Sequence, residues 1–286
     1  MKKTIVFLLV LFSAMLVQAQ EDSLRANRYV MRSMLFGAGY TNVLDTYLSP
    51  LEYKGCEIRI LRESMRMTRL MDGNVSSQNI LQAYTSYTKN TSGTSYFYTG
   101  MLNWSYALHY QFQINERLKI LFGPVLDLNA GFVYNPRNSN NPAQAKAYGN
   151  IGASGMAIGK FHIGNYPLTA RYQVALPLMG IMFSPEYGQS YYEIFSLKHG
   201  GKNILFTSLH NNPSLKQMIT LDFPIRNTIL RVGYLCEIQQ AHVNNLKSHI
   251  YSHDFMIGFV KNLYLLKGKN KISMPNAFTC LLYTSP

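Results

Sequence analysis

Apolar and polar side chains alternate along residues 100–114, GMLNWSYALHYQFQI. Large apolar residues occupy every second position of one face: Leu102, Trp104, Tyr106, Leu108, Tyr110, Phe112 and Ile114. Mostly small or polar residues lie between them. Because successive side chains of an extended chain point to opposite sides, this period of two predicts a β-strand. A strand with one wide apolar face and one polar face is typical of a barrel wall between lipid and a wet interior.

A second strand of the same parity follows the short turn at residues 115–117. Its apolar face carries Leu118, Ile120, Phe122, Leu126, Leu128, Phe132 and Tyr134. Pro124 falls on that face and cannot donate a ladder hydrogen bond, so we expect a bulge or a local break there. Alternation places Asp127 and Asn129 inward, where the charge of Asp127 avoids lipid.

Strand patterns recur roughly every 20–25 residues, which predicts one antiparallel up-and-down transmembrane β-barrel. If residues 166–183 form one kinked strand, the barrel has about 10 strands. If that segment splits at Pro177 and residues 203–209 also pair, it has about 12, the number we favour.

Connection lengths predict which end of the barrel faces which compartment. Short connections at residues 115–117, 165–167 and 223–227 are typical of the periplasmic end, and the long segment 135–149 of the extracellular end.

The two ends of the chain are expected to lie outside the barrel. Lys2, Lys3 and the apolar run 4–17 resemble a signal peptide, with cleavage expected after Ala19. No later segment has the roughly 18 consecutive apolar residues that a spanning helix needs. Residues 280–286, CLLYTSP, resemble a translated sequencing adapter, so we assign the barrel to residues 20–279.

Composition agrees with an exported β-protein. Aromatic residues are abundant, with 21 Tyr and 15 Phe, whereas only 14% of residues are charged. The formal net charge of +13 falls to +11 without Lys2 and Lys3. Scattered basic residues behind an export signal suit outer-membrane lipids and lipopolysaccharide as partners, rather than nucleic acid. Cys56 and Cys236 could form one disulfide, although nothing in the sequence specifies it.

Several segments of the chain resemble the sequences of a known protein family. They are YLSPLEYKGCEIRILRESMRMTRLMDGN (residues 47–74), MLNWSYALHYQF (101–112), MFSPEYGQSYYEIF (182–195), FTSLHNNPSLKQM (206–218) and YSHDFMIGFVK (251–261). The chain resembles a domain-of-unknown-function family of exported, β-rich proteins from gut Bacteroidetes. The resemblance implies a cell-envelope location in the outer membrane and implies no activity for any residue.

His210 and Ser214 are the nearest approach to catalytic chemistry. Some outer-membrane lipid hydrolases use a His as the base for a Ser nucleophile. Those enzymes space the two residues by two positions, whereas here the spacing is four and Pro213 intervenes. Asn-Pro is a turn signal, so a structural turn is the better interpretation. We therefore expect no enzymatic activity, with the hydrolase as an alternative.

Histidines gather in the C-terminal part of the chain, at His199, His210, His242, His249 and His253. No pair has a spacing diagnostic of zinc, so we predict neither a metal nor a cofactor. Alternation places His249 and His253 outward with Phe255, beside Tyr251, where polar-tipped side chains suit the membrane interface.

Ligand-binding candidates fall into two groups. Tyr191, Tyr192 and Glu193 begin a long region that could fold over or into the interior and bind a small molecule or lipid. His109, Asp127, Arg231 and Glu237 face the interior and could line a pore or a hydrogen-bonded plug. Barrels of about 8 strands are filled by side chains, and those of about 16 leave a channel. A count of 10 or 12 strands therefore does not distinguish a pore from a plug.

The function that the sequence favours is a non-enzymatic outer-membrane barrel, acting as a narrow pore or as a ligand-binding or structural envelope protein. The alternatives are a lipid hydrolase and a soluble periplasmic β-rich binding protein.

Overall fold

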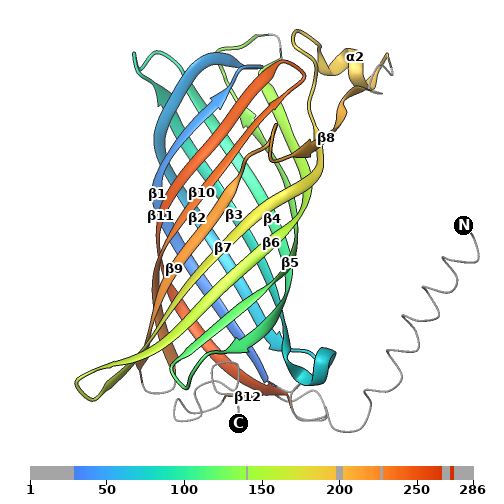
Figure 1. The fold of residues 1–286 in the computed structure, drawn as a ribbon. Helices are drawn as coiled ribbons and strands as arrows, with labels where there is room; N and C mark the ends of the chain where they lie inside the picture. Colours follow the sequence, from blue (N-terminus) through green and yellow to red (C-terminus); the bar gives the residue numbers. More distant parts are fainter. Residues whose placement is uncertain (1–28, 140, 198–201, 226–227, 266–270, 274–286) are drawn as a thin grey trace, which may run out of the picture.

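Ten long strands form a closed antiparallel barrel (Figure 1). The computed structural model describes residues 29–139, 141–197, 202–225, 228–265 and 271–273. The predicted signal peptide and the adapter-like segment lie outside these residues. The barrel strands are β1 (Tyr29–Asp45), β2 (Ser49–Met67), β3 (Val75–Asn90), β4 (Tyr96–Gln113), β5 (Leu118–Tyr134), β6 (Ala143–Ile163), β7 (Tyr166–Phe183), β9 (Leu215–Ile225), β10 (Thr228–Val243) and β11 (Leu246–Leu265).

Each barrel strand pairs with its neighbour in the order β1 to β7, then β9, β10 and β11, and β11 pairs with β1 to close the barrel. Short elements complete the fold: the 3-10 helix η2 (Leu70–Gly73), the helix α2 (Tyr191–Phe195), β8 (Ile204–Ser208), which pairs with β7, and β12 (Lys271–Ser273), which pairs with β11.

The favoured count of 12 barrel strands is wrong, and the alternative of ten is correct. Residues 166–183 form a single strand, because the chain passes Pro177 with a register shift against β6 rather than a turn. The five-residue strand β8 pairs only with the last part of β7 within the described residues, so it adds no crossing.

The alternation on β4 and β5 is confirmed. Leu102, Phe112 and Phe122 are exposed on the outer surface, whereas Asn103 and His109 are buried inside. The expected irregularity at Pro124 is a local break without a register change. The β4–β5 ladder pairs Ala107 with Val125 and then Tyr110 with Phe122, and skips the residues between them.

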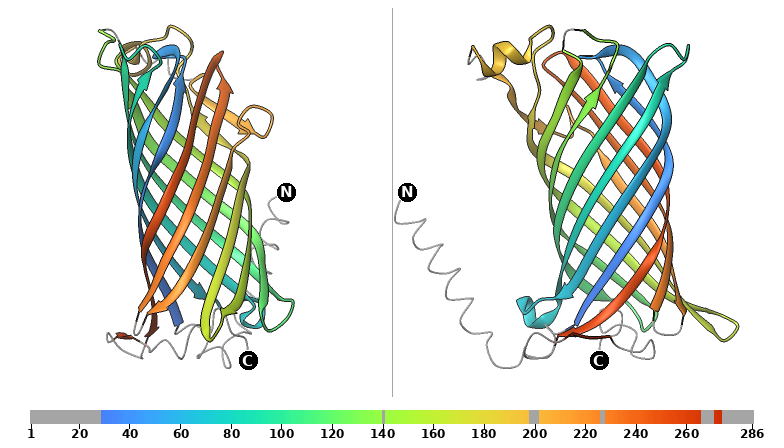
Figure 2. Two further views of the ribbon diagram at one scale, coloured as in Figure 1. Left: turned by 90° about the vertical axis from the view of Figure 1, so that its left-hand side faces the viewer. Right: turned by 180° about the vertical axis from the view of Figure 1, so that it is seen from behind.

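The three short connections meet at one end of the barrel, the turn end, where β1 begins and β11 ends (Figure 1). The β5–β6 connection lies at the opposite end, the loop end, as does α2 (Figure 2). That β5–β6 connection is shorter than predicted, because β6 already begins at Ala143.

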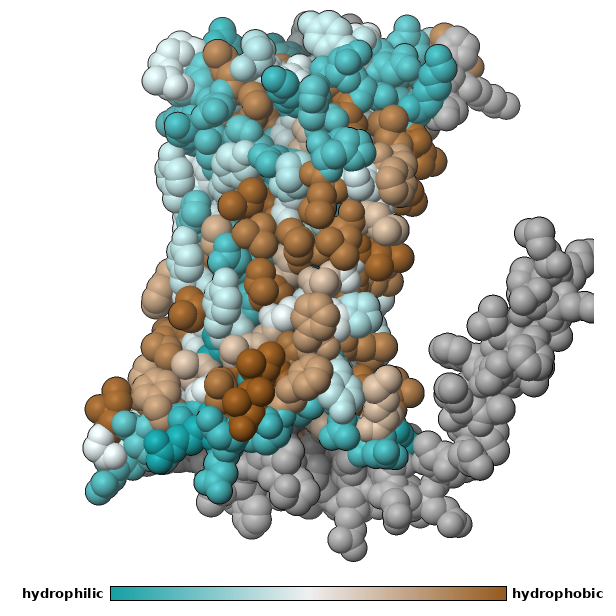
Figure 3. Space-filling view, viewed as in Figure 1, coloured by the Kyte–Doolittle hydropathy of each residue, from teal (hydrophilic) through white to brown (hydrophobic). Residues whose placement is uncertain are grey.

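On the face shown in Figure 3, the outer surface is largely apolar around its middle and hydrophilic at both ends. Tyr134, Tyr98 and Tyr87 lie side by side on β5, β4 and β3, and Tyr40 extends this row on β1 beyond Cys56. Such a row near the loop end is the aromatic girdle expected where a barrel leaves the hydrocarbon layer. No helix within the described ranges is long and apolar enough to span a membrane.

Apolar clusters lie inside the barrel toward each end. The cluster at the turn end consists of Met31, Met65, Leu121, Met156, Ile158, Ile229 and Val260. The cluster at the loop end consists of Val43, Leu48, Tyr53, Tyr84, Phe97, Met101, Val133 and Ile250. A third apolar cluster lies between these two and consists of Leu35, Leu61, Ile80, Met218, Leu235 and Met256. Apolar and polar layers therefore alternate along the interior.

Candidate binding site in the barrel interior

A charge-balanced cluster of Glu63, Asp222, Arg171 and Arg231 crosses the interior near the turn end. Arg171 donates two hydrogen bonds to Glu63, at 2.7 and 2.9 Å. Arg231 donates to Glu63 at 2.8 Å and to both oxygens of Asp222 at 2.6 and 2.7 Å. All four residues are buried. Buried charges are tolerated when they are paired and hydrogen-bonded in this way.

A carboxylate-rich cluster lies closer to the loop end, with Arg59 at its centre. The Arg59 guanidinium donates to Glu57 at 2.6 Å, to Glu237 at 2.6 Å and to Asp254 at 2.8 Å. It also lies over the ring of Tyr84, 4.1 Å from the centroid. One buried cation therefore holds three carboxylates, so its removal would leave more than one buried anion without compensation.

Lys216 on β9 extends the carboxylate-rich cluster toward β5. Its Nζ lies 3.2 Å from Glu237 and 3.6 Å from Asp127, and it donates to Asn103 at 3.1 Å. The cluster as a whole thus combines Arg59 and Lys216 with four carboxylates, Glu57, Asp127, Glu237 and Asp254. Unlike the balanced cluster, it contains more carboxyl groups than basic side chains.

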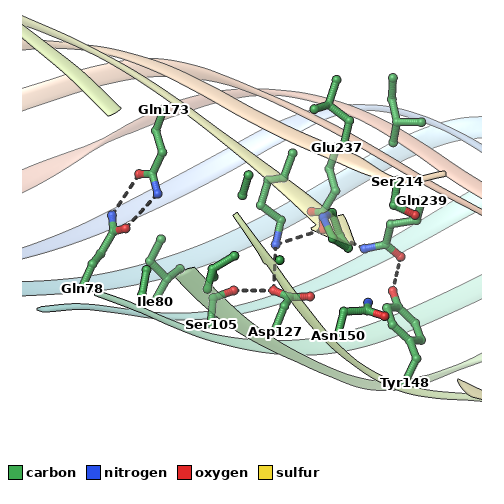
Figure 4. A pocket seen from close by; sticks show the side chains of 18 residues that line it. Gln78, Ile80, Ser105, Asp127, Tyr148, Asn150, Gln173, Ser214, Glu237 and Gln239 are labelled. Atoms are coloured by element: carbon green, nitrogen blue, oxygen red, sulfur yellow. Dashed lines mark hydrogen bonds and ion pairs between the residues drawn. The ribbon is translucent and has the colours of Figure 1, made fainter. Parts of the chain in front are cut away.

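Neutral hydrogen bonds extend from the balanced cluster across the interior. Gln78 and Gln173 form a reciprocal amide pair across the interior, at 2.9 and 2.8 Å (Figure 4). Gln78 also donates to Glu63 at 2.6 Å, and Gln173 donates to Ser154 at 3.3 Å. His109 Nε2 shares a 3.0 Å hydrogen bond with Ser154.

A central cavity of about 50 Å³ lies beside the amide pair and the Lys216 contacts (Figure 4). Apolar side chains that line it are Ile80, Ala107, Val125, Ala175, Pro177, Leu215 and Ile238, and polar ones include Asp127, Tyr148, Lys216 and Glu237. One ordered water needs roughly 10–15 Å³ of such volume, so the cavity has room for a few waters or for the end of an apolar chain.

The structure places all four predicted interior residues, His109, Asp127, Arg231 and Glu237, inside the barrel. Asp127 and Glu237 line the central cavity. Arg231 belongs to the balanced cluster, and buried His109 contacts Ser154. Their role in ligand binding stays a prediction.

Sequence reasoning missed Arg59, Glu63, Arg171, Lys216 and Asp254. A signal was present on β2, where Glu57, Arg59 and Glu63 share one parity and alternate with exposed Ile58 and Ile60. A charged face opposite an apolar face predicts an inward-facing charged stripe.

Tyr191, Tyr192 and Glu193 lie on α2 at the rim of the loop end, and not in the interior (Figure 1). The Tyr191 hydroxyl accepts a hydrogen bond from the Ala145 amide at 2.6 Å, and its burial raises the tyrosine pKa. Glu193 forms a capping box with Ser190. Tyr192 is 66% exposed. Two of the three side chains therefore stabilise the rim, and the third faces solvent.

The structure does not pair His210 with Ser214. Nδ1 of His210 shares a hydrogen bond with Ser208, and Ser214 donates to Asn212 at 2.8 Å. The turn interpretation is supported, because Asn211 and Asn212 both donate their backbone N–H to the Ser208 carbonyl.

Metal and disulfide chemistry receive no support from the described part of the chain. It contains no group of three or more His, Cys, Asp or Glu residues arranged to hold a metal. Cys56 and Cys236 are free thiols there. They occupy β2 and β10, and β1 and β11 lie between those strands.

Comparison of the sequence with protein families matches residues 4–270 to the family described as "Protein of unknown function (DUF3316)". No curated protein matches the sequence.

Solved structures with a similar fold are outer-membrane β-barrels of low sequence identity. The transport unit of the Escherichia coli autotransporter AIDA-I has a TM-score of 0.47 and 6% identity, over 86% of this chain and 93% of that chain. The E. coli outer membrane protease OmpT has a TM-score of 0.42 and 7% identity, over 87% and 100%. The β domain of the Bordetella autotransporter BrkA has a TM-score of 0.41 and 10% identity, over 84% and 100%. These likenesses concern the fold alone.

Proposed function

Because this chain belongs to the DUF3316 family of proteins of unknown function, we infer its role from its geometry. We propose that it is a closed outer-membrane barrel that binds a small ligand in its central cavity. In this proposal it neither conducts ions nor catalyses a reaction. The apolar middle of the face shown in Figure 3, together with exposed apolar side chains such as Ile58, Phe122 and Ile151, supports a membrane location over the soluble alternative.

One observation carries the proposal. Glu63 on β2 and Arg171 on β7 lie on opposite walls of a ten-strand barrel and join through two hydrogen bonds. With Arg231 and the Gln78–Gln173 pair, they form a continuous layer across the interior. Ions would have to displace buried ion pairs to pass this layer, which supports a binding protein over an open pore.

Planar-bilayer recording tests the closed state. We expect the wild-type barrel to stay at the baseline conductance. Arg171→Ala should produce small conductance steps, because it removes the side chain that spans the interior while Arg231 still compensates Glu63. Arg62→Ala is the matched control, since Arg62 is exposed on the outer face of the same strand as Glu63. Steady steps from the wild-type protein would contradict the proposal.

A second measurement tests the membrane location. A folded transmembrane barrel should migrate faster on a gel when it is not boiled, and it should remain with the membrane after carbonate extraction. Release into the soluble fraction would favour the periplasmic binding protein instead.

A further inference from the structure

The barrel wall is discontinuous between β7 and β10 near the loop end. The edge of β7 pairs with β9 at residues 169–175 and with β8 at residues 179–183. Residues 176–178 have no ladder partner on that edge among the described strands. Pro177 lies in this gap and has no N–H to donate, and the register shift against β6 falls beside it. Proline and bulges mark places where strand pairing ends.

The facing edge of β10 has few hydrogen bonds in this region. Its pairing with β9 ends where Ile238 meets Leu215. Beyond that point, within the described residues, the His242 amide donates to the Asn211 carbonyl at 2.8 Å and the Gln240 amide donates to Ser214 Oγ at 3.4 Å. We call this interruption the seam: residues 176–178 of β7, residues 239–243 of β10 and the loop 209–214 between them.

A basic groove of about 240 Å³, the outer groove, lies on the outside of the seam. Its lining residues are Leu44, His210, Asn211, Pro213, Gln240, Ala241, His242, Lys247, Ser248 and His249. One Lys and three His are present and no carboxylate is among these lining residues. Nε2 of His249 is buried and finds no hydrogen-bond partner within the described part of the chain. The chemistry of this groove suits a phosphate or another anionic group.

A small cavity lies between the outer groove and the central cavity. This cavity of about 30 Å³ shares Gln240, Ala241, Ser248 and His249 with the outer groove. The same small cavity shares Tyr148 and Gln239 with the central cavity. Three adjoining cavities therefore run from the outside of the wall to the middle of the barrel, along β10 and through the seam.

Charge and polarity change along this row of cavities. The outer groove is basic, whereas the central cavity has an apolar lining beside the carboxylate-rich cluster. The lipid-facing surface next to the seam is apolar, with Met179 53%, Ile181 58% and Phe206 63% exposed. An anionic head would be attracted to the groove and repelled from the interior, and an apolar chain would be accepted by both the seam and the cavity.

We propose that the seam is a lateral binding site for an anionic membrane lipid, with the phosphate head in the outer groove and one acyl chain passing between β7 and β10 into the central cavity. This inference rests on the proposed function, because it names the ligand class and its path. Separation of the two edges requires loss of the two loop hydrogen bonds and of the bond that the Asn244 side chain donates to the Ser184 carbonyl at 3.0 Å. On its other edge β10 pairs continuously with β11 from Ile229 to Val243.

The path is tested by photo-crosslinking in nanodiscs of phosphatidylcholine that contain phosphatidylglycerol with a diazirine at the end of one acyl chain. Ala107 faces the central cavity, and Leu108 faces the outside of the same strand. Mass spectrometry should find label on both residues. Label on Leu108 with none on Ala107 or Ile80 would overturn the proposal.

A disulfide across the seam supplies the decisive variant. Asn211→Cys with His242→Cys, with Ser replacing Cys56, Cys236 and Cys280, joins two residues whose backbones already share a hydrogen bond. Oxidation should reduce the label on Ala107 about fivefold or more and reduction should restore it, with Leu108 unchanged. Ala83→Cys with Leu102→Cys is the matched control, because these residues are directly opposite on the continuous wall. Unchanged Ala107 label in the oxidised seam variant would show another path and refute the proposal.

The proposed binding of the anionic head group in the outer groove is tested with the double variant Lys247→Gln, His249→Gln. Loss of the basic side chains should lower Ala107 labelling by phosphatidylglycerol about fivefold, since one cation near an anionic head is worth roughly 1 kcal/mol. Exposed Lys89 on β3, which does not line the groove, provides the control variant Lys89→Gln. Equal labelling of the wild-type protein by a diazirine phosphatidylcholine would overturn the preference for an anionic head.

Failure of the lateral site differs from failure of the proposed function. If a small water-soluble diazirine labels Ala107, the lipid probe does not, and conductance stays at baseline, the cavity binds from the aqueous side and only the lateral site is lost. If the wild-type barrel conducts, the proposed function itself fails.

Discussion

The two sides of the barrel wall are built differently. From β1 to β5, hydrogen-bonded ladders run nearly the whole length of the strands, as in the pairing of β2 and β3 from Tyr53 to Met67. From β7 to β10, β9 supplies only the half near the turn end, and β8 and a loop supply the rest. A barrel thus becomes locally separable where a proline and a short strand replace one continuous neighbour.

The interior shows a parallel difference. The balanced cluster matches two arginines with two carboxylates, so either cation can be lost while the other still compensates Glu63. The carboxylate-rich cluster depends on Arg59 and Lys216 alone. It lies near the seam, because Lys216 pairs with Ala175 at the last β7–β9 position. Stability is therefore expected to depend on different residues in the two clusters.

The largest effect should come from removal of Arg59. Arg59→Ala leaves Glu57 and Asp254 buried beside each other without their cation, which costs about 3–5 kcal/mol or prevents folding. Arg171→Ala should cost clearly less, because Arg231 and Gln78 still bond to Glu63. Urea unfolding in detergent micelles, followed by the gel shift of unboiled samples, measures both. Equal losses would remove the distinction between the clusters.

A smaller effect is expected from crowding the continuous wall. A Cβ at Gly258 would lie 1.9 Å from the Met34 carbonyl oxygen, so Gly258→Ala must push β11 and β1 apart. We expect a loss of about 1–3 kcal/mol. Gly159→Ala is the control, because a Cβ there meets nothing within 4 Å. The same unfolding assay compares the stabilities of the two variants. A Gly258→Ala protein as stable as the wild type would show that β1 and β11 separate as easily as the strand edges at the seam.

Amide exchange should separate the seam from the continuous wall without any mutation. The Gln240 and His242 amides are expected to exchange faster than those of Gln82 and Asn103, which lie in the β3–β4 ladder. Opening free energy rises with the number of paired neighbours. Hydrogen–deuterium exchange with mass spectrometry gives the ratio of the exchange rates of the two pairs of amides. Equal protection of both pairs would contradict a separable seam.

The smallest effect concerns the rim at the loop end. The hydroxyl of Tyr47 donates to the Gln189 carbonyl at 2.9 Å, and burial together with nearby Tyr191 and Asp45 raises the Tyr47 pKa to about 12. The neutral hydroxyl is therefore favoured in the folded rim. Its contribution is complete below pH 10 and is lost as the pH rises through 12.

Tyrosine ionisation is followed by ultraviolet absorbance in the wild-type protein and in the Tyr47→Phe variant. The difference between the two titration curves gives the pKa of Tyr47. A midpoint near 10 would show that the hydroxyl is free in solution and that the rim contact does not form.

Much of the wall was predictable from strand parity. The faces of β4 and β5, the break at Pro124 and the inward position of Asp127, Arg231 and Glu237 follow from period-two alternation, which is a local property. The number of strands did not follow, because Pro177 is compatible with a turn or with a bulge, and only the pairing of β7 with β6 decides between them. The candidate pair His210 and Ser214 failed because the turn directs each side chain to another neighbour.

The sequence by itself determined that alternate residues face lipid and that charged residues line the interior, because an extended chain has only two faces. The tertiary structure alone decided which charges meet, since Glu63 and Arg171 are 108 positions apart in the chain and their contact depends on barrel closure and register. It also decided that the wall is interrupted beside Pro177, because a strand edge is left unpaired only when its spatial neighbour ends.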